Sequence, residues 1–398
     1  MWRVRGPHSA AVAISAPRIG PHTPGAAGDP DDTVRDPNEA DKQRGRGATL
    51  SPANRYARLQ RDAFEDGWND SEEAPPPLQT VVAQDRSRRV ITYNSSPDVG
   101  FDRSINPYRG CEHGCVYCFA RPSHAWLDLS PGLDFESRLF YKYDAPRLLR
   151  DELSAPGYRC APIAVGINTD AYQPVERRFG LTRQVLEVLV DTGHPFLIVT
   201  KSALIERDID LIADAARKGQ AAVSVTITTL DRALARRMEP RAAAPQRRLA
   251  TIKALAEAGV PVTVMVAPVI PALTDSELEA ILNQARSAGA RHASYALLRL
   301  PYEIGDMFTD WLESHYPSKA SHVLSRIRDT RAGALYDGTF HRRMTGCGAY
   351  ARLIRDRFDL AARRLGFTDG AHLDSSRFRP PRANGQLDLF QSGSGSRC

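Results

Sequence analysis

Three cysteines lie close together in the sequence, and their spacing indicates more chemistry than any other feature of the chain. Cys111, Cys115 and Cys118 follow one another as C-x3-C-x2-C in the run NPYRGCEHGCVYCF at residues 106–119, with a glycine directly before the first and the second cysteine. Thiolates on one such tight loop can converge on an inorganic centre. Because three thiolates leave one iron of a four-iron cluster open to an outside ligand, the spacing predicts a [4Fe-4S] cluster with an open iron.

Two other interpretations of these cysteines are a zinc knuckle and three unrelated buried thiols. A structural zinc ion is usually held by four ligands in two separated pairs. The fourth ligand would have to be His113, Cys160 or Cys347, and none of these belongs to a second paired motif. Tyr117, directly before the last cysteine of the loop, also fits the face of a cofactor better than a zinc turn. The pattern therefore favours iron and sulfur, and Cys160 and Cys347 are predicted to be buried structural thiols.

The cysteine loop resembles a known family. The string C-x3-C-x-Tyr-C is similar to the cluster loop of radical S-adenosylmethionine (SAM) enzymes, and the longer string SINPYRGCEHGCVYCFARP at residues 104–122 resembles their spore-photoproduct-lyase-like branch. The similarity covers residues 102–301, roughly half of the chain. It implies that the cluster binds S-adenosyl-L-methionine at its open iron, that an external one-electron donor reduces it, and that cleavage of SAM gives a 5′-deoxyadenosyl radical.

Short apolar runs alternate with helical stretches after the cysteine loop. The runs are five to seven residues long and mostly β-branched, as is typical of strands covered on both faces. Glycine follows the helical stretches, which favours repeated β–α units and a parallel sheet. The fold class is therefore α/β, and the resemblance implies an open partial TIM barrel of about six parallel β/α units with active residues at the carboxyl ends of its strands. The expected strands are 163–167, 196–200, 222–227, 262–267 and 292–298, and the expected helices are 181–190, 208–217, 247–258 and 275–288.

The sequence divides into four predicted parts. Residues 1–75 have the composition of a disordered tail and linker, and residues 76–302 form the barrel with the cluster loop at 110–119. Residues 303–367 are predicted to be a helical extension, with helices at 304–314, 322–332 and 350–365, and residues 368–398 a disordered basic tail. No apolar run reaches the roughly 18 residues of a membrane span, and six cysteines form no disulfide framework. A soluble, cytoplasmic protein without a membrane partner is expected.

Five residues are the predicted contacts for SAM. Lys201 ends the strand 196–200, where it would meet the methionine carboxylate, and the segment resembles the family's lysine strand. Thr169 and Asp170 follow the strand 163–167 and match the Ser-Asp pair of the family, while Ser224 matches a family serine on an otherwise apolar strand. The resemblance also implies that Tyr117 lies near the adenine. The alternatives are a surface lysine for Lys201 and a backbone-bonded hydroxyl for Ser224.

Two positions depart from spore photoproduct lyase. That enzyme returns a hydrogen atom to its product through a cysteine and a tyrosine, and the matching positions here are Ile167 and Phe119. Neither side chain readily donates a hydrogen atom. The radical-generating half of the reaction is therefore expected, whereas repair of spore photoproduct itself is not.

The positive charge of the chain is concentrated near its C-terminal end. The formal net charge is +6, and residues 340–398 contain 11 arginines against five aspartates, so the rest of the chain is neutral. A basic region is expected of a protein whose partner carries phosphates, such as DNA. A solvated helix face and the arginine-rich usage of high-GC genomes are equally good explanations.

A short motif near the end of the chain indicates a second partner. The pentapeptide QLDLF at residues 386–390 resembles the segment by which bacterial DNA polymerases and repair proteins bind the sliding clamp. Leu387, Leu389 and Phe390 are apolar residues in a polar segment, and Gln386 would orient the last two as anchors. Five residues make a short pattern that also occurs by chance, so this motif is a hypothesis.

Three functions fit the sequence. The first is a radical SAM enzyme that acts on nucleic acid, in DNA lesion repair or base modification, and is recruited by a clamp-binding tail. The second is a radical SAM enzyme for a small molecule or a protein, and the third a non-catalytic iron–sulfur binding module. SAM cleavage under reducing conditions separates the third from the others, and salt-dependent DNA binding separates the first two.

Overall fold

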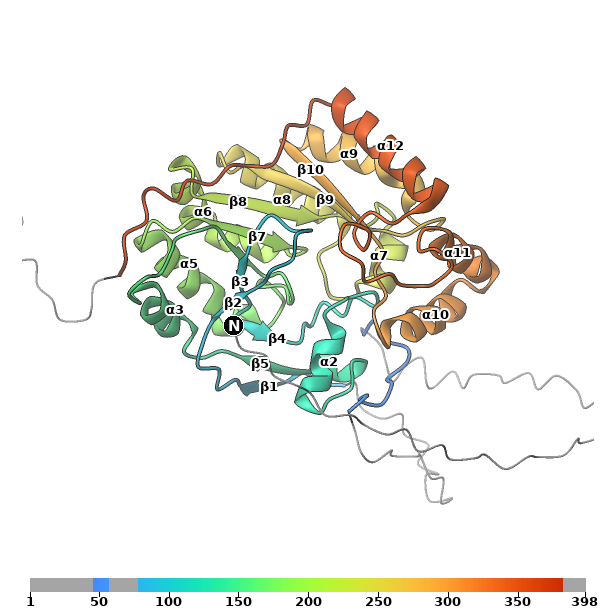
Figure 1. Cartoon of the computed structure of the whole chain (residues 1–398), viewed down its shortest axis with the longest axis horizontal. Helices are drawn as coiled ribbons and strands as arrows, with labels where there is room; N and C mark the ends of the chain where they lie inside the picture. The colour runs from blue at the N-terminus through green and yellow to red at the C-terminus, as the bar shows by residue number, and fades with distance from the viewer. Residues whose placement is uncertain (1–45, 57–77, 382–398) are drawn as a thin grey trace, which may run out of the picture.

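The computed structural model describes residues 46–56 and 78–381, and a sheet of seven strands forms its centre (Figure 1). The strand order is β10-β9-β8-β7-β6-β3-β2, and a smaller sheet has the order β1-β5-β4. The strands are β1 Val81–Gln84, β2 Ile91–Tyr93, β3 Arg103–Ile105, β4 Tyr108–Arg109, β5 Arg138–Tyr141, β6 Ile163–Val165, β7 Phe196–Thr200, β8 Ala221–Thr226, β9 Val262–Val269 and β10 His292–Leu297.

The large sheet confirms the predicted parallel α/β architecture. From β3 through β6 to β10, six neighbouring strands of the described chain are parallel, and only β2 at the edge runs antiparallel to its neighbour β3. Because parallel strands need crossover connections, each pair from β6 onward is joined through at least one helix. The chain therefore forms an open partial barrel, and the cysteine loop follows its first parallel strand.

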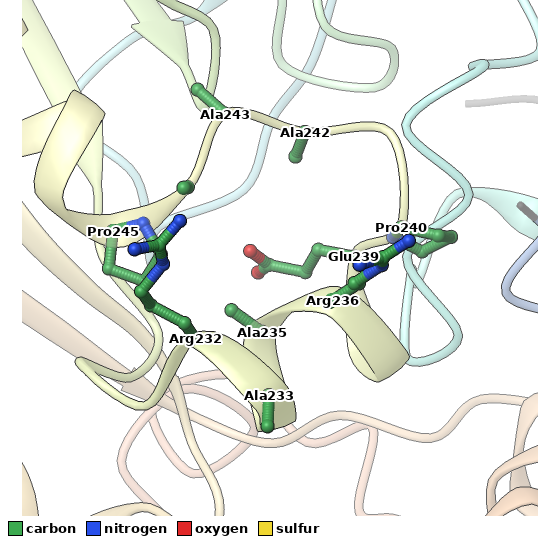
Figure 2. Close-up of a pocket in the computed structure, with 10 residues that line it drawn as sticks. Arg232, Ala233, Ala235, Arg236, Glu239, Pro240, Ala242, Ala243 and Pro245 are labelled. Carbon is green, nitrogen blue, oxygen red and sulfur yellow. The ribbon is translucent and has the colours of Figure 1, made fainter.

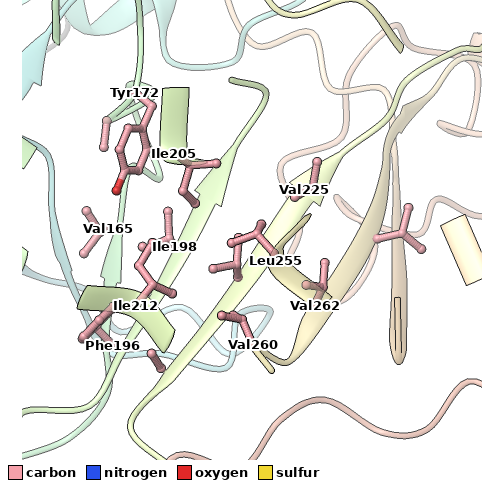
Figure 3. Close-up of a cluster of buried hydrophobic side chains, with 14 of the residues drawn as sticks. Val165, Tyr172, Phe196, Ile198, Ile205, Ile212, Val225, Leu255, Val260 and Val262 are labelled. Carbon is pink, nitrogen blue, oxygen red and sulfur yellow. The ribbon is translucent and has the colours of Figure 1, made fainter. Parts of the chain in front are cut away.

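The strands alternate between two environments. In β8, Val223 and Val225 lie in the main hydrophobic core, whereas Ser224 between them has the opposite direction and is only partly buried. Ser224 is paired in register with Val199 of β7 and Thr263 of β9. Apolar side chains of the outer face pack against the helices, as Figure 3 shows for β6 to β9. The inner face of the barrel therefore carries polar side chains such as Ser224 and Thr263 between apolar ones such as Val199.

Helices cover the outer face of the sheet, and three more follow the last strand (Figure 1). Helices α10 and α11 pack on each other, and α12 packs against both α9 and α11, which matches the predicted helical extension. No helix in the described ranges is both long and apolar enough to cross a lipid bilayer. The α-helices are α2 Leu133–Ser137, α3 Ala145–Leu153, α4 Glu176–Phe179, α5 Leu181–Asp191, α6 Ile209–Arg217, α7 Arg232–Met238, α8 Pro245–Glu257, α9 Leu278–Ser287, α10 Ile304–His315, α11 Pro317–Asp329 and α12 Gly348–Arg364, and the short 3-10 helices are η1 Arg121–Leu127, η2 Ala203–Asp208 and η3 Asp275–Glu277.

The segment after α12 follows the sheet instead of leaving it. Thr368 forms a β-bridge with His292, the Asp374 amide donates to the Gly219 carbonyl at 2.8 Å, and the Arg379 amide donates to the Thr192 carbonyl at 2.8 Å. The first part of the predicted disordered tail, residues 368–381, thus lies along the amino-terminal edge of the barrel. These backbone hydrogen bonds require no particular side chains. Neither the hydrophobic periodicity nor the composition of the segment therefore indicated that it is ordered. The QLDLF motif lies outside the described residues.

A second segment joins the two edges of the open sheet. The Met344 carbonyl accepts a hydrogen bond of 2.8 Å from the Leu297 amide at the end of β10. The same segment contacts the loop between β2 and β3, where the Arg343 guanidinium and the His341 amide both donate to the Asp98 carboxylate. We call residues 336–347 the strap. It closes the seam that an incomplete barrel leaves between its first and last strands.

Candidate functional site

The cysteine loop lies at the carboxyl end of the first parallel strand, next to the core. Cys111 and Cys115 are buried and Cys118 is partly buried, and none of them is in a disulfide. The Cys111 amide donates to the Phe135 carbonyl at 2.9 Å, and the Cys118 amide donates to the Cys115 carbonyl at 3.2 Å. The loop is therefore a fixed turn of the folded domain.

Two glycines allow the backbone of this loop to be packed closely. Gly114 has a φ of 66°, and a Cβ there would lie 2.7 Å from Oε2 of Glu136. Gly47, from the segment 46–56, lies directly against the loop, because a Cβ on it would lie 1.7 Å from the Gly114 carbonyl oxygen. A larger residue at Gly47 would push the segment 46–56 away from the cysteine loop, and a larger residue at Gly114 would displace the Glu136 carboxylate.

The loop fits an iron–sulfur cluster better than a single metal ion. Burial raises the pKa of the Cys111 thiol and raises that of the Cys115 thiol to about 12, so free thiolates are disfavoured there unless a positively charged centre compensates them. Within the described ranges, no three His, Cys, Asp or Glu side chains are arranged to hold one metal ion. Thiolates on a four-iron cluster each bind a different iron, so they need not meet at one point. The loop cysteines therefore suit a cluster, and they would be its ligands.

A fully buried ion pair supports one side of the cysteine loop. The Arg121 guanidinium pairs with Glu136, and both side chains are 0% exposed. Arg121 also donates to the Cys115 carbonyl at 2.9 Å and to the Gly114 carbonyl at 3.1 Å. The Glu136 carboxylate accepts hydrogen bonds of 2.9 Å from the amides of Gly47 and Ala48. One charge pair thereby fixes the carbonyls of the loop and the segment 46–56 together.

A second buried ion pair supports the opposite side of the loop. The carboxylate of Glu239 pairs with Arg248, and it accepts hydrogen bonds from the hydroxyls of Tyr117 and Thr228. Although burial alone would raise the pKa of Glu239, the charges of Arg248 and Lys201 lower it overall. Burial and the neighbouring Glu239 charge both raise the pKa of Tyr117, so its phenol remains protonated and donates. Tyr117 is thus held by side chains from the β8–α8 connection.

Asp170 joins two neighbouring strand ends. Its carboxylate accepts hydrogen bonds from the Lys201 amide at 2.7 Å and the Thr200 hydroxyl at 2.8 Å, and it lies 3.3 Å from Nδ1 of His113 in the cysteine loop. Burial alone would raise the pKa of Asp170, but the interaction with His113 and the hydrogen bonds from the Lys201 and Tyr172 amides lower it overall. The carboxylate thus lies beside the loop, with most of its acceptor capacity already used by the protein.

The remaining predicted contacts have different surroundings. The Lys201 side chain is partly buried, and its Nζ lies 5.8 Å from the centre of the Tyr117 ring. Thr169 is buried, and its hydroxyl donates to the Tyr108 carbonyl at 2.8 Å, so it supports the chain before the cysteine loop. Ser224 faces the inside of the barrel, one strand away from Lys201. Lys201, Tyr117 and Asp170 therefore surround the cysteine loop closely, whereas the role of Ser224 as a contact stays a prediction.

Of the two positions that depart from spore photoproduct lyase, Phe119 directly follows the last cysteine of the loop and Ile167 follows the end of β6. Phe119 is 39% exposed, and the Arg299 guanidinium lies 4.8 Å above its ring. Arg299 follows β10, and one of its nitrogens lies 3.7 Å from the Met344 sulfur of the strap. Ile167 is partly buried directly after β6. An apolar ring and a cation thus occupy the open side of the loop.

A cavity of about 580 Å³ lies beside the second buried ion pair (Figure 2). It is bounded by α7, by the start of α8 and by the chain between them. Figure 2 shows the side chains of Arg232, Arg236 and Glu239 around it. Because Glu239 also contacts Tyr117, this cavity is separated from the cysteine loop by one layer of side chains.

Comparisons with known proteins agree with this site. Residues 105–285 match the family model of the Radical SAM superfamily. An uncharacterized protein of Mycobacterium tuberculosis is 40% identical over 231 residues, which are 58% of this chain and 67% of the relative. An uncharacterized protein of Methanocaldococcus jannaschii is 31% identical over 173 residues, which are 44% of this chain and 62% of the relative. The chain belongs to the radical SAM superfamily.

The fold is similar to that of spore photoproduct lyase. A cysteine-to-serine mutant of that enzyme matches with a TM-score of 0.51 and 15% sequence identity, covering 72% of this chain and 79% of the other. Spore photoproduct lyase complexed with dinucleoside spore photoproduct matches with a TM-score of 0.50 and 14% identity, covering 71% and 79%. At such identities the similarity concerns the fold, and it confirms the partial TIM barrel.

Sequence reasoning missed the residues that support the loop. Arg121 and Glu136 are 15 positions apart, and Glu239 and Arg248 come from separate elements, so no spacing marks either pair. The only sequence signal for these ion pairs was a charged residue among residues that are otherwise buried. Arg248, for example, stands in α8 beside the buried Thr251 and Ile252.

Proposed function

We propose that the protein is a radical SAM enzyme that reductively cleaves SAM at a [4Fe-4S] cluster and acts on nucleic acid, in DNA lesion repair or base modification. When bound, the cluster and SAM would supply a 5′-deoxyadenosyl radical that abstracts a hydrogen atom from the substrate. The observation that carries the proposal is the buried loop of Cys111, Cys115 and Cys118 at the carboxyl end of the first barrel strand, in a chain of this superfamily.

The residues around the loop would bind and orient SAM. The Lys201 ammonium is the cation for the methionine carboxylate, since it lies beside Tyr117 at the end of β7. Asp170 would orient this lysine by accepting the hydrogen bond of its backbone amide. Ser224 would hydrogen-bond SAM from the inner face of β8. Tyr117, fixed by Glu239, would pack against the adenine.

The nucleic-acid substrate is supported by the charge of the C-terminal region. Helix α12 packs on α9 and α11, and its exposed arginines outnumber its aspartates. Phosphates would be the natural ligands of such a face. Spore photoproduct lyase, which shares the fold, has been solved with a dinucleoside spore photoproduct, and that relation adds support at the level of fold. The exposed arginines of α12 are Arg352, Arg355, Arg363 and Arg364.

The reaction would differ from that of spore photoproduct lyase at its last step. Ile167 and Phe119 carry neither an S–H nor an O–H group, so neither returns a hydrogen atom to a product radical. The proposed substrate is therefore a DNA lesion or modified base other than spore photoproduct.

The C-terminal pentapeptide would recruit the enzyme to replicating or repaired DNA. A peptide of residues 383–392 should bind a bacterial sliding clamp with micromolar affinity, about 8 kcal/mol at the standard state. Leu389 and Phe390 would enter an apolar pocket, with Gln386 at its rim. Replacing Leu389 and Phe390 by alanine should remove binding, and equal binding of both peptides would contradict the recruitment hypothesis.

The direct test is SAM cleavage by the full chain. The protein is reconstituted with iron and sulfide without oxygen, reduced with dithionite, and incubated with SAM and with damaged or undamaged DNA. We expect 5′-deoxyadenosine to form, and damaged DNA to increase its yield above that of undamaged DNA. Absence of 5′-deoxyadenosine under all conditions would contradict the enzyme proposal. Formation that no DNA changes would contradict the nucleic-acid substrate alone.

A further inference from the structure

We propose that the exposed face of α7, together with the cavity beside it, is the docking surface for an acidic one-electron donor protein. This inference rests on the proposed function, because a cluster that cleaves SAM needs one electron from outside the chain. In the transfer, the donor loses one electron and the cluster gains it, with no bond made or broken and no proton moved.

Helix α7 packs directly on the cysteine loop. The amide of Val116 donates to the Met238 carbonyl at 3.0 Å, and Leu234 and Met238 share a hydrophobic cluster with Val116 and Cys115. Leu234 and Met238 are four positions apart, so they form one face of the helix, and this face lies on the loop. Electron transfer slows steeply with distance, so a donor on the opposite face of α7 is well placed.

The outer face of α7 carries more positive than negative charge, with three exposed arginines and one exposed aspartate at its start. Arg232 and Arg236 are exposed, also four positions apart, and neither has an ion pair among the residues that the structure describes. Arg237 is exposed too, and its guanidinium lies 5.3 Å from the centre of the Tyr316 ring. Asp231, directly before Arg232, is exposed, but its carboxylate caps the helix by accepting hydrogen bonds from the Ala233 and Leu234 amides, and Glu239 is 2% exposed and already paired with Arg248. An acidic surface would therefore complement this face.

The cavity makes this charged face concave, so that side chains of a partner can enter it. Its volume of about 580 Å³ admits one or two side chains of a partner, and Arg232 and Arg236 lie in its wall (Figure 2). Aspartate or glutamate side chains of the donor would enter it and pair with the two guanidinium groups. A cavity with two cations at its wall next to the cofactor loop favours an acidic protein partner over an uncharged one.

The chain offers a matched control at the other end of the same strand. Helix α7 follows the carboxyl end of β8, whereas Arg217 and Lys218 at the end of α6 precede its amino end. Arg217 and Lys218 are 65% and 44% exposed. Replacing this pair removes the same charge as replacing Arg232 and Arg236, but at the edge of the barrel far from the cysteine loop.

The experiment measures binding of a bacterial flavodoxin, an acidic one-electron carrier, to the full chain. We expect salt-sensitive binding that is weakened on the order of tenfold in Arg232→Gln/Arg236→Gln and is unchanged in Arg217→Gln/Lys218→Gln. The rate of cluster reduction by reduced flavodoxin should fall in parallel, while reduction by dithionite stays equal in all three proteins. Equal flavodoxin affinity of wild type and Arg232→Gln/Arg236→Gln would overturn the proposal.

Failure of the docking proposal and failure of the proposed function give different results. If dithionite-reduced wild type forms no 5′-deoxyadenosine, the enzyme proposal fails regardless of flavodoxin binding. If 5′-deoxyadenosine forms with dithionite but the two double variants bind flavodoxin equally well, only the docking surface is wrong.

Discussion

The cysteine loop and the strap are both held by ion pairs, but these pairs differ in how far they are buried. Arg121 and Glu136 beside the loop are both 0% exposed, whereas Arg343, which pairs the strap with Asp98 of the β2–β3 loop, is 18% exposed and Asp98 is 2% exposed. A buried charge that loses its partner has no water to replace it, while an exposed one does. The loop is therefore fixed strongly in one geometry, and the strap closes the seam of the barrel at a smaller energetic cost of opening.

This difference corresponds to two tasks. A cluster that passes an electron to SAM would need ligands at fixed positions, and the two buried ion pairs beside the loop hold it within the folded domain. Arg299 links the strap to the cysteine loop, because its guanidinium lies 4.8 Å from the centre of the Phe119 ring and one of its nitrogens lies 3.7 Å from the Met344 sulfur. The contrast predicts that substitutions near the loop reduce stability and cluster content more than equivalent substitutions in the strap do.

The largest effect is expected from the loop cysteines. Cys111→Ala, Cys115→Ala or Cys118→Ala should each abolish the cluster, because two thiolates are too few to hold it. Iron and sulfide analysis after anaerobic reconstitution measures this. Cys347→Ala in the strap is the matched control and should retain the full iron content. A loop mutant with full iron, or a wild type with one zinc and no iron, would disprove the cluster assignment.

The second largest effect is expected from the buried pair. Glu136→Gln should lower the free energy of unfolding by about 3–5 kcal/mol, because Arg121 then keeps a buried charge without a counter-charge. Chemical denaturation of the protein without cluster measures the change. Replacing both partners, as in Arg121→Met/Glu136→Leu, should cost less than the single change. If the single variant is as stable as wild type, the loop is not held by this pair.

A smaller effect is expected for SAM binding. Lys201→Ala should weaken SAM binding by about 1.5–3 kcal/mol, the contribution of a charge-assisted hydrogen bond, while the iron content stays unchanged. Equilibrium binding of SAM to the reconstituted protein measures it, with Lys218→Ala at the opposite edge of the barrel as control. Unchanged affinity would assign the methionine carboxylate to another cation, with Arg241 as the next candidate.

The smallest effect is expected in the strap. Asp98→Asn removes the charge that pairs with Arg343, but the strap keeps its backbone hydrogen bond from Leu297 to Met344. The loss of stability should be smaller than that of Glu136→Gln, because Arg343 is 18% exposed and can still meet water whereas Arg121 cannot, and iron content should not change. Thermal unfolding of both variants in one buffer compares them. A loss as large as that of Glu136→Gln would remove the distinction between loop and strap.

Sequence reasoning predicted the elements of the barrel but not what holds its site. The strands β6 to β10 followed from short apolar runs such as that around Val223, because burial on both faces demands such residues. The seam and the strap did not follow, because Asp98 and Arg343 are 245 positions apart and no local pattern joins them. The cysteine spacing marked the cluster loop, while the carboxylates that fix it come from other parts of the chain.

The predicted bounds of the N-terminal linker and the C-terminal tail were wrong for the same reason, because long-range contacts leave no local pattern. Residues 46–56 fall in the predicted linker, yet the amides of Gly47 and Ala48 donate to Glu136. Hydrogen bonds from backbone amides leave no trace in composition or periodicity. The same is true of residues 368–381, which bind the edge of the sheet through backbone hydrogen bonds such as that of the Arg379 amide.

The position of Gly47 against Gly114 has a practical consequence for the choice of protein fragments. A fragment cut at residue 76, or at the start of the family match at residue 105, would keep all three cysteines and every barrel strand from β6 to β10. It would nevertheless lack the Gly47 and Ala48 amides, which donate hydrogen bonds to the Glu136 carboxylate. The side of the cysteine loop that the segment 46–56 covers would then be open to water. Oxygen and chelators would then reach the iron from behind, so such a fragment should purify colourless although its ligands are intact.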